Sequence, residues 1–199
     1  SIYLIDKELR ILQKEGVGEK AAIVPIIGEL KDREYMDYIL SKLKCDVIFH
    51  CAAYKHVPLM EENPVAVIEN NVFGTKNILD AAIKARVSKF VLISTDKAVS
   101  PVSIYGASKM ISEKLLLDAA AKAKEENLDS DFMFVRFGNV LGSRGSVLPL
   151  FMSQIQTGGP ITVTDKNMQR YFMTIPEACS LVLKTERKKK NGFSYLLDM

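Results

Sequence analysis

Two pairs of side chains in the middle of the chain could carry out proton transfer on an alcohol. Tyr105 and Lys109 are four residues apart, so on a helix they would lie on one face. A phenol is a poor base at neutral pH, but a neighbouring ammonium is expected to lower its pKa. Such a pair can take a proton from an alcohol while a hydride leaves the same carbon. Asp96 and Lys97, adjacent in the sequence, offer a second acid and base.

The elements that must position these groups follow a regular alternation. Short apolar runs rich in β-branched residues predict strands, and longer segments of helical periodicity predict helices between them. This alternation is typical of an α/β fold, a Rossmann-like doubly wound parallel sheet. The predicted strands are Ile2–Ile5, Ala22–Ile26, Asp46–Cys51, Lys89–Ser94 and Phe132–Phe137. The predicted helices are Lys7–Lys14, Arg33–Leu43, Pro64–Ala85 and Ile104–Glu126.

After Asn139 the rhythm changes to loops that contain glycine and proline. A helix near Ser146–Gln156 and a strand near Ile161–Val163 are predicted there, followed by a helix near Pro176–Lys184 and a strand near Phe193–Leu197. We expect one domain over residues 1–199, in which residues of about 139–199 contribute a small cap on the sheet that binds substrate.

The composition excludes several classes of protein. The 199 residues contain 27 Lys and Arg against 24 Asp and Glu, and both signs are interspersed, which argues against nucleic acid as a partner. No apolar stretch is long enough to cross a bilayer, so no membrane segment is predicted. Cys45, Cys51 and Cys179 form no C-x-x-C pair, and no histidine or carboxylate cluster suggests a metal. A reducing, cytoplasmic setting is expected.

An acidic residue at the end of the first predicted strand suggests a dinucleotide site. In dinucleotide-binding folds a carboxylate at the tip of the second strand accepts hydrogen bonds from the adenosine ribose, and Asp6 would occupy that place. The glycine-rich turn that cradles the pyrophosphate lies about 20 residues before such a carboxylate. Because the sequence starts at Ser1, we expect an N-terminally truncated chain without its first strand and glycine-rich loop.

Five longer motifs surround the two proton-transfer pairs: HCAAYKHVPLMEENP, ENNVFGTKNILDAA, FVLISTDKAVSP, RFGNVLGSRGSVLPLF and RYFMTIPEA. With Tyr105-x-x-x-Lys109 they resemble the CapD-type UDP-N-acetylglucosamine 4,6-dehydratases, members of the extended short-chain dehydrogenase/reductases. The resemblance extends from about Asp46 to Ala178. It implies an enzyme of bacterial polysaccharide synthesis that uses NAD(P) to oxidise C4 of a UDP-sugar, eliminates water across C5–C6 and returns the hydride to C6. It also implies a homo-oligomer, and membrane helices before this segment as in long family members.

The resemblance assigns roles to individual residues. Catalysis falls to Thr95, Asp96, Lys97, Tyr105 and Lys109, with Asp96 as the acid and Lys97 as the base of the elimination. The positions that contact NAD(P) are Asp6, Glu29, Leu30, Ala52, Ala53, Tyr54, Ser94, Tyr105 and Lys109. The positions around the UDP-sugar are Lys55, Asn71, Asn139, Arg144, Gly145, Ser146 and Arg170.

Two other functions stay open from the sequence. A 4-epimerase of the same superfamily also begins with C4 oxidation, but it has no use for the Asp96–Lys97 pair. A non-catalytic nucleotide-binding module would need neither an acid nor a base. Of the two histidines, His50 is expected to be a packed strand-end residue. For His56 two alternatives stay open: its side chain faces the site, or it points elsewhere.

Overall fold

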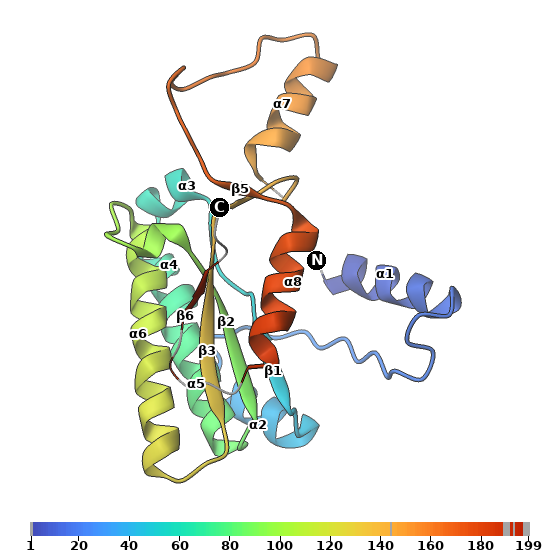
Figure 1. The fold of residues 1–199 in the computed structure, drawn as a ribbon, viewed down its shortest axis with the longest axis vertical. Helices are drawn as coiled ribbons and strands as arrows, with labels where there is room; N and C mark the ends of the chain where they lie inside the picture. The colour runs from blue at the N-terminus through green and yellow to red at the C-terminus, as the bar shows by residue number, and fades with distance from the viewer. Residues whose placement is uncertain (1, 144, 189–191, 193, 197–199) are drawn as a thin grey trace.

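The computed structural model describes residues 2–143, 145–188, 192 and 194–196. Within them, four parallel strands form the central sheet in the order β1-β2-β3-β6 (Figure 1). These strands are β1 (Val47–His50), β2 (Lys89–Thr95), β3 (Asp131–Phe137) and β6 (Ser194–Leu196). Because all of them run the same way, their carboxyl ends meet at one edge of the sheet, where α/β folds bind ligands.

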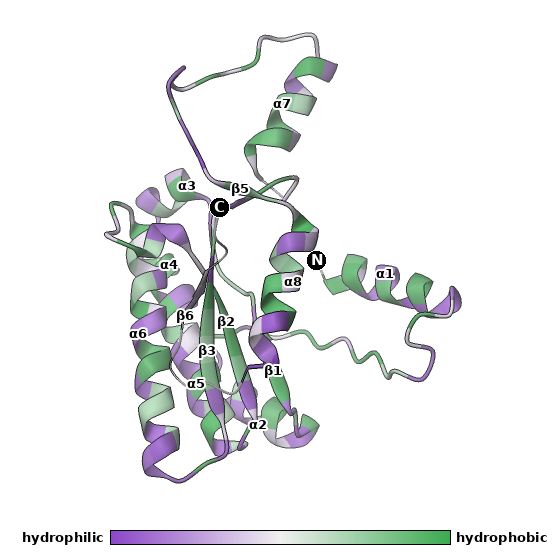
Figure 2. Cartoon of the chain, in the orientation of Figure 1, coloured by the Kyte–Doolittle hydropathy of each residue, from purple (hydrophilic) through white to green (hydrophobic). Residues whose placement is uncertain are grey.

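Helices cover both faces of this sheet (Figure 1). On β2, Phe90 and Leu92 face a core shared with α2 (Arg33–Leu43), α5 (Gly74–Lys84) and α6 (Ile104–Glu125). The intervening Val91 packs on the opposite face, against α8 (Ile175–Glu186). Both faces of the strand are therefore apolar, as Figure 2 shows for the middle of the sheet, and the prediction of a doubly wound α/β fold is confirmed.

The single helix predicted over Pro64–Ala85 is divided in the structure. After α3 (Val57–Glu62), the chain forms α4 (Pro64–Val67), a π-helical segment η1 (Ile68–Phe73) and then α5. The hydroxyls of Thr75 and Ser112 both donate to the carbonyl oxygen of Asn71, at 2.6 and 2.8 Å. Both hydroxyls thus hydrogen-bond to a backbone carbonyl oxygen within the π-helical segment. Single π-helical turns of this kind are common at functional sites.

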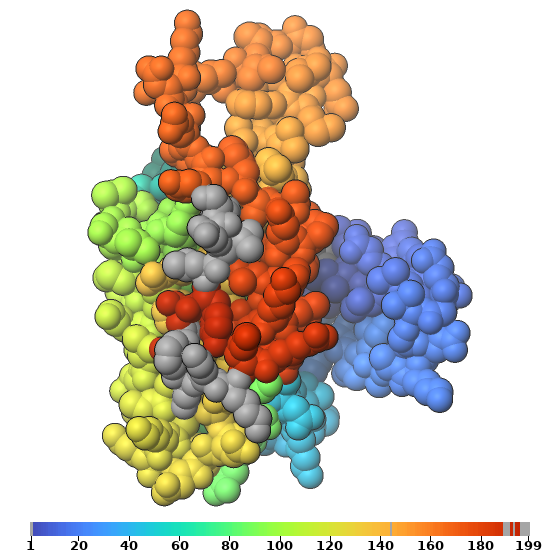
Figure 3. Space-filling model, viewed as in Figure 1, coloured from blue at the N-terminus to red at the C-terminus, as the bar shows by residue number. Residues whose placement is uncertain are grey.

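Residues 139–173 project from the sheet, whereas the residues after them return to it. β4 (Asn139–Val140) pairs with β5 (Phe172–Met173), and between them α7 (Val147–Gln156) extends away from the body (Figures 1 and 3). The strand predicted near Ile161–Val163 is wrong: this segment is exposed and is not a strand in the structure. The helix predicted near Pro176–Lys184 is α8, and β6 lies within the predicted last strand, of which Phe193 and Leu197 are outside the described residues.

The first 32 residues differ most from the prediction. Ile2–Ile5 belongs to a helix, α1 (Ile2–Lys14), and Ala22–Ile26 is extended chain without a strand partner, so both predicted strands are wrong. A strand needs a neighbour for its backbone hydrogen bonds, while a helix satisfies its own. α1 buries none of its side chains. In the described part of the chain, no helix combines the length and the apolar character that crossing a membrane requires.

Candidate active site

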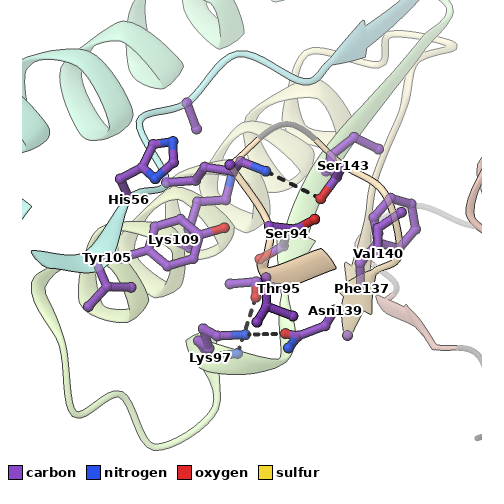
Figure 4. Close-up of a pocket in the computed structure, with 18 of the residues that line it drawn as sticks. His56, Ser94, Thr95, Lys97, Tyr105, Lys109, Phe137, Asn139, Val140 and Ser143 are labelled. Atoms are coloured by element: carbon purple, nitrogen blue, oxygen red, sulfur yellow. Dashed lines mark hydrogen bonds between the residues drawn. The ribbon is translucent and has the colours of Figure 1, made fainter. Parts of the chain in front are cut away.

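A cavity of 340 Å³ lies at the carboxyl ends of β1, β2 and β3 (Figure 4). Its lining comes from these strand ends, from the first turns of α6 and from the segment that leads into α7. The polar and aromatic residues among that lining are Cys51, Lys55, His56, Ser94, Thr95, Lys97, Tyr105, Lys109, Phe137, Asn139, Ser143, Ser146 and Phe172. Many of the side chains singled out in the sequence therefore share one space.

Tyr105 and Lys109 reach the cavity from the first two turns of α6. The side chain of Ser103 caps this helix by accepting from the Gly106 N–H at 3.1 Å, and Glu61 Oε1 accepts from the Ile104 N–H at 2.8 Å. Both caps fix where the helix begins, and hence the positions of the phenol and the ammonium. As their spacing predicts, the two side chains lie on one helix face and both line the cavity.

Burial dominates the protonation equilibria of this pair. It lowers the pKa of the Lys109 ammonium to about 8, although the carboxylate of Glu113 opposes the change. Burial also raises the pKa of the Tyr105 phenol above its ordinary value, and a hydrogen bond with Thr95 offsets only part of that effect. The pKa of Tyr105 is therefore raised overall and not lowered as the sequence predicts, because the desolvation of the phenolate outweighs the contributions that stabilise it.

The second pair, Asp96 and Lys97, is an ion pair in the short helix η2 (Asp96–Ala98). Lys97 Nζ lies 3.0 Å from Asp96 Oδ1. It also lies 3.1 Å from Asn139 Oδ1, a contact drawn in Figure 4. The Thr95 hydroxyl donates to the same Asp96 oxygen at 2.9 Å. An acid and a base are thus already joined by a hydrogen bond along which a proton can pass.

A close contact between backbones brings the two pairs together. A Cβ atom at Gly106 would lie only 2.3 Å from the carbonyl oxygen of Lys97, so only glycine lets α6 approach η2 this closely. Gly106 follows Tyr105 directly, and the contact therefore sets the phenol beside the Asp96–Lys97 pair.

A third group of charges beneath the cavity was not predicted from the sequence. Glu113 on α6 accepts two hydrogen bonds from the guanidinium of Arg136, at 2.9 and 2.7 Å, and one from the Ser94 hydroxyl at 2.5 Å. Two signals could have indicated it: Glu113 follows Lys109 by four residues, and Arg136 interrupts an apolar strand.

Asn71 lies below the loop of residues 52–54 and outside the lining of the cavity. Its side chain is 1% exposed; it accepts from the Tyr54 N–H at 2.8 Å and donates to the Tyr54 carbonyl at 3.0 Å. A third hydrogen bond, at 3.1 Å, joins it to Ser108 on α6. The amide therefore fastens the loop to the helix that carries Tyr105 and Lys109.

The mouth of the cavity combines a cation with a tight backbone approach. Lys55 Nζ lies 3.5 Å from the Ser143 hydroxyl, and Gly145 packs so closely against His56 that a Cβ atom there would lie 2.1 Å from the imidazole ring. His56 therefore faces the site, whereas His50 is a buried strand-end residue, as expected. Ser146 is the N-cap of α7, and its buried hydroxyl has no hydrogen-bond partner among the described residues.

Comparison with known proteins identifies the family. A model described as "Polysaccharide biosynthesis protein" matches residues 1–199. The chain belongs to this polysaccharide biosynthesis family. It is 47% identical over 199 residues to the capsular polysaccharide biosynthesis protein CapD of Staphylococcus aureus, covering all of this chain and 32% of that protein.

Two further relatives carry names that specify a reaction. A UDP-N-acetylglucosamine 4,6-dehydratase (inverting) of Campylobacter jejuni is 35% identical over 96% of this chain, and a UDP-glucose 4-epimerase of Rickettsia canadensis is 39% identical over 94%. The chain spans 56% of each of these two proteins. Among solved structures, Pen from Bacillus thuringiensis is 37% identical, with a TM-score of 0.86 over 98% of this chain and 59% of its own.

Four of the positions that the resemblance assigned to the cofactor or substrate lie away from the cavity. Asp6, on α1, pairs with Arg10 at 2.9 Å. Glu29 is exposed and pairs with Lys31 at 3.0 Å. Leu30 packs against the core, and Arg170 is exposed and donates to the backbone of its neighbour. The expectation that Asp6 ends a strand is wrong, since it lies inside a helix.

Most of the remaining predicted positions border one or both of two adjoining cavities. Ala53 and Gly145 line the 340 Å³ cavity, whereas Ala52 lines neither. Tyr54 borders an adjoining cavity of 620 Å³, which Ala53 also lines. Arg144 lies outside the described residues. In the part of the chain that the structure describes, no three His, Cys, Asp or Glu side chains come close enough to hold a metal ion.

Proposed function

We propose that the chain is the catalytic part of an NAD(P)-dependent UDP-sugar 4,6-dehydratase, acting on UDP-N-acetylglucosamine or a similar UDP-hexose in polysaccharide synthesis. The observation that carries the proposal is that Lys97 lines the same cavity as Tyr105 and Lys109 and is ion-paired with Asp96, which directly precedes it and is not itself part of the lining. Oxidation of an alcohol needs one proton acceptor, whereas elimination of water needs an acid and a base as well. The four side chains provide groups for both steps.

Half of a dinucleotide site is present around the cavity. Lys109 and the loop of residues 52–54, which Asn71 fastens, suit the nicotinamide end, at the edge of the sheet where such cofactors bind. Asp6 and Glu29, which the resemblance assigned to the rest of the cofactor, make ion pairs away from this cavity. When bound, NAD(P) would supply a hydride acceptor for C4 and later a hydride donor for C6.

The oxidation step depends on the charge of the Tyr105–Lys109 pair. Tyr105 takes the proton of the C4 hydroxyl, which requires the phenolate. Because burial raises the pKa of this phenol, a positive charge must stabilise the phenolate. Lys109, with a pKa of about 8, is mainly protonated at pH 7 and provides that charge within the same cavity.

The elimination step uses the second pair without a net change in its protons. A proton passes from Lys97 Nζ to Asp96 Oδ1, over 3.0 Å, and leaves a neutral amine beside a neutral acid. Lys97 then takes the proton from C5, and Asp96 protonates the C6 hydroxyl, which departs as water. The ion pair is thereby restored, held by Thr95 and Asn139.

The mouth of the cavity suits the diphosphate of a UDP-sugar. Lys55 provides a cation there, and Gly145 and Ser146 lead into the N-terminus of α7, whose backbone N–H groups favour anions. Arg144 and Arg170 remain predicted contacts of the same group. Assembly as a homo-oligomer and a cytoplasmic location also stay predictions.

An isotope experiment distinguishes this function from its alternative. A UDP-glucose 4-epimerase is supported by the Rickettsia relative, which is more similar to this chain than the dehydratase is. UDP-N-acetylglucosamine carrying deuterium at C4 is incubated with the chain and NAD(P), and the product is analysed by NMR and mass spectrometry. A dehydratase moves the label to C6 and produces a sugar lighter by one water. Label recovered only at C4 would contradict the proposal, and retention of cofactor without any conversion would favour a binding module.

A further inference from the structure

We propose that Glu113 is a positioning residue of this site: clamped by Arg136, its carboxylate fixes the Ser94 hydroxyl and keeps the Lys109 side chain charged. The importance of this role for turnover rests on the proposed function, but the contacts themselves do not.

The placement of Glu113 on α6 is the first step. It lies four residues after Lys109 and eight after Tyr105, so the three side chains follow one another along one face of the helix. Glu113 is 4% exposed and Lys109 is 3% exposed. A buried carboxylate is costly unless it is paired, and here it accepts three hydrogen bonds.

The partners of Glu113 come from two neighbouring strands. Ser94 on β2 and Arg136 on β3 are directly opposite each other in the register of the sheet. Both side chains reach the Glu113 carboxylate, which therefore joins α6 to the sheet one helical turn after Lys109. The Arg136 guanidinium also lies 5.3 Å from the centre of the Phe134 ring, and this contact restricts its position further.

The hydrogen-bond pattern separates the roles of the two hydroxyls at the end of β2. Ser94 donates its proton to Glu113, at 2.5 Å, so the Ser94 oxygen presents only lone pairs to the cavity. The next hydroxyl, that of Thr95, contacts the catalytic side chains Asp96 and Tyr105 instead. Because Glu113 holds the Ser94 hydroxyl, the Thr95 hydroxyl is the one that contacts the reacting groups.

The charges around Lys109 support the second part of the proposal. On α6 it is flanked by Tyr105 and Glu113, while His50 ends β1 and Cys51 follows that strand directly. Burial lowers the pKa of His50 to about 3, so the imidazole is neutral at pH 7. Asp96 is bound to Lys97. Glu113 is therefore the anion that opposes the loss of the Lys109 proton at pH 7. Arg136 holds the Glu113 carboxylate in place, and its own positive charge acts on Lys109 in the opposite sense.

Two substitutions with opposite expected effects test this arrangement in the intact chain. Lysines are labelled with ¹³C at Cε, and the Lys109 signal is assigned by its absence from Lys109→Arg. Glu113→Gln removes the anion and is expected to lower the pKa of Lys109 by about one unit. Arg136→Met removes a cation and leaves the carboxylate, so the pKa of Lys109 is expected to rise. Asp118→Asn is the matched control, because Asp118 is an exposed carboxylate of the same helix that pairs with Lys122; the Lys109 titration should not change.

Opposite shifts of the Lys109 pKa in the two variants support the proposal, because a general loosening of the fold would change this pKa in the same direction in both. An unchanged pKa in Glu113→Gln, or shifts of the same sign in both variants, would overturn it. If Glu113→Gln does not fold, the variant that combines Glu113→Gln with Arg136→Met removes both buried charges, and Lys109 should then titrate below its wild-type pKa. The titration needs neither cofactor nor sugar. A chain with the expected shifts but no dehydratase activity would contradict the proposed function and leave this inference intact.

Discussion

At the level of single residues, the two proton-transfer pairs differ in their exposure to solvent. Lys109 is 3% exposed, whereas the side chains of Asp96 and Lys97 are 41% and 37% exposed. Removal from water strengthens the influence of Lys109 on a charge that develops nearby. The Asp96–Lys97 pair, in contrast, remains close to solvent, which suits a step that releases water.

Substitutions of Tyr105 and Asp96 should separate the two steps. Tyr105→Phe removes the acceptor of the C4 proton, and we expect turnover to fall by about 10²- to 10⁴-fold with no oxidised sugar formed. Asp96→Asn retains that acceptor but cannot protonate the C6 hydroxyl, so the 4-keto sugar and reduced cofactor should accumulate. The absorbance of the reduced cofactor measures this directly. Full dehydration by Asp96→Asn would show that Asp96 is not the acid.

The buried histidine predicts a pH dependence of stability. His50 Nε2 lies 3.0 Å from the Thr75 hydroxyl, and burial lowers the pKa of His50 to about 3. The unfolded chain binds this proton near pH 6.5, so the stability linked to His50 is present above that pH and is lost as the pH falls towards 3. We expect the free energy of unfolding to decrease by about 2 kcal/mol from this source between pH 7 and pH 5.

Urea unfolding of wild type and His50→Gln at both pH values measures that contribution. Other titrating groups affect the two proteins alike, and the variant should therefore lose about 2 kcal/mol less than wild type between pH 7 and pH 5. Equal losses in the two proteins would mean that His50 has the same pKa in the folded and unfolded states, which contradicts the prediction.

At the scale of elements, the contact between α6 and η2 decides whether the two pairs share one cavity. Gly106→Ala would place a methyl group 2.3 Å from the Lys97 carbonyl oxygen, and one of the two elements must move. We expect a loss of about 1–3 kcal/mol in the free energy of unfolding. Dehydration should decline beyond what this loss explains, because Tyr105 and Lys97 separate.

Gly159→Ala is the matched control for this contact. The nearest atom to a Cβ at Gly159 is 3.9 Å away, which is ordinary contact, so stability and activity should stay close to those of wild type. Urea unfolding and initial rates are measured for both variants. A fully stable and active Gly106→Ala would show that the close approach of α6 to η2 is not needed.

At the scale of the whole molecule, stability should be unevenly distributed. α1 and α7 bury no side chains, whereas α6 contributes Leu116, Ala119 and Ala123 to the main core. Helices without tertiary packing open easily. We expect the backbone amides of α1 and α7 to exchange on the order of 100-fold or more faster than those of α6, as measured by hydrogen–deuterium exchange with mass spectrometry. Equal protection of α1 and α6 would contradict this description of the fold.

From about residue 33 onward, most of the architecture could be predicted from the amino-acid pattern alone. α2, β1, β2, α6 and β3 lie close to their predicted ranges, because apolar periodicity reports directly on which face of an element is buried. The helical spacing of Tyr105 and Lys109 likewise determined that they share a face. Both are local properties, settled within a few turns of chain.

Features that depend on neighbours distant in sequence became apparent from the folded chain alone. Ile2–Ile5 has the composition of a strand but lies in a helix, since a strand requires a partner. The pKa of Tyr105 is raised because burial, which the sequence does not show, outweighs the stabilising contacts. In the Glu113 cluster, Ser94 and Arg136 are 19 and 23 positions away from Glu113 in the sequence. The three residues come from two strands and a helix. Such contacts exist only once the sheet and its helices have packed.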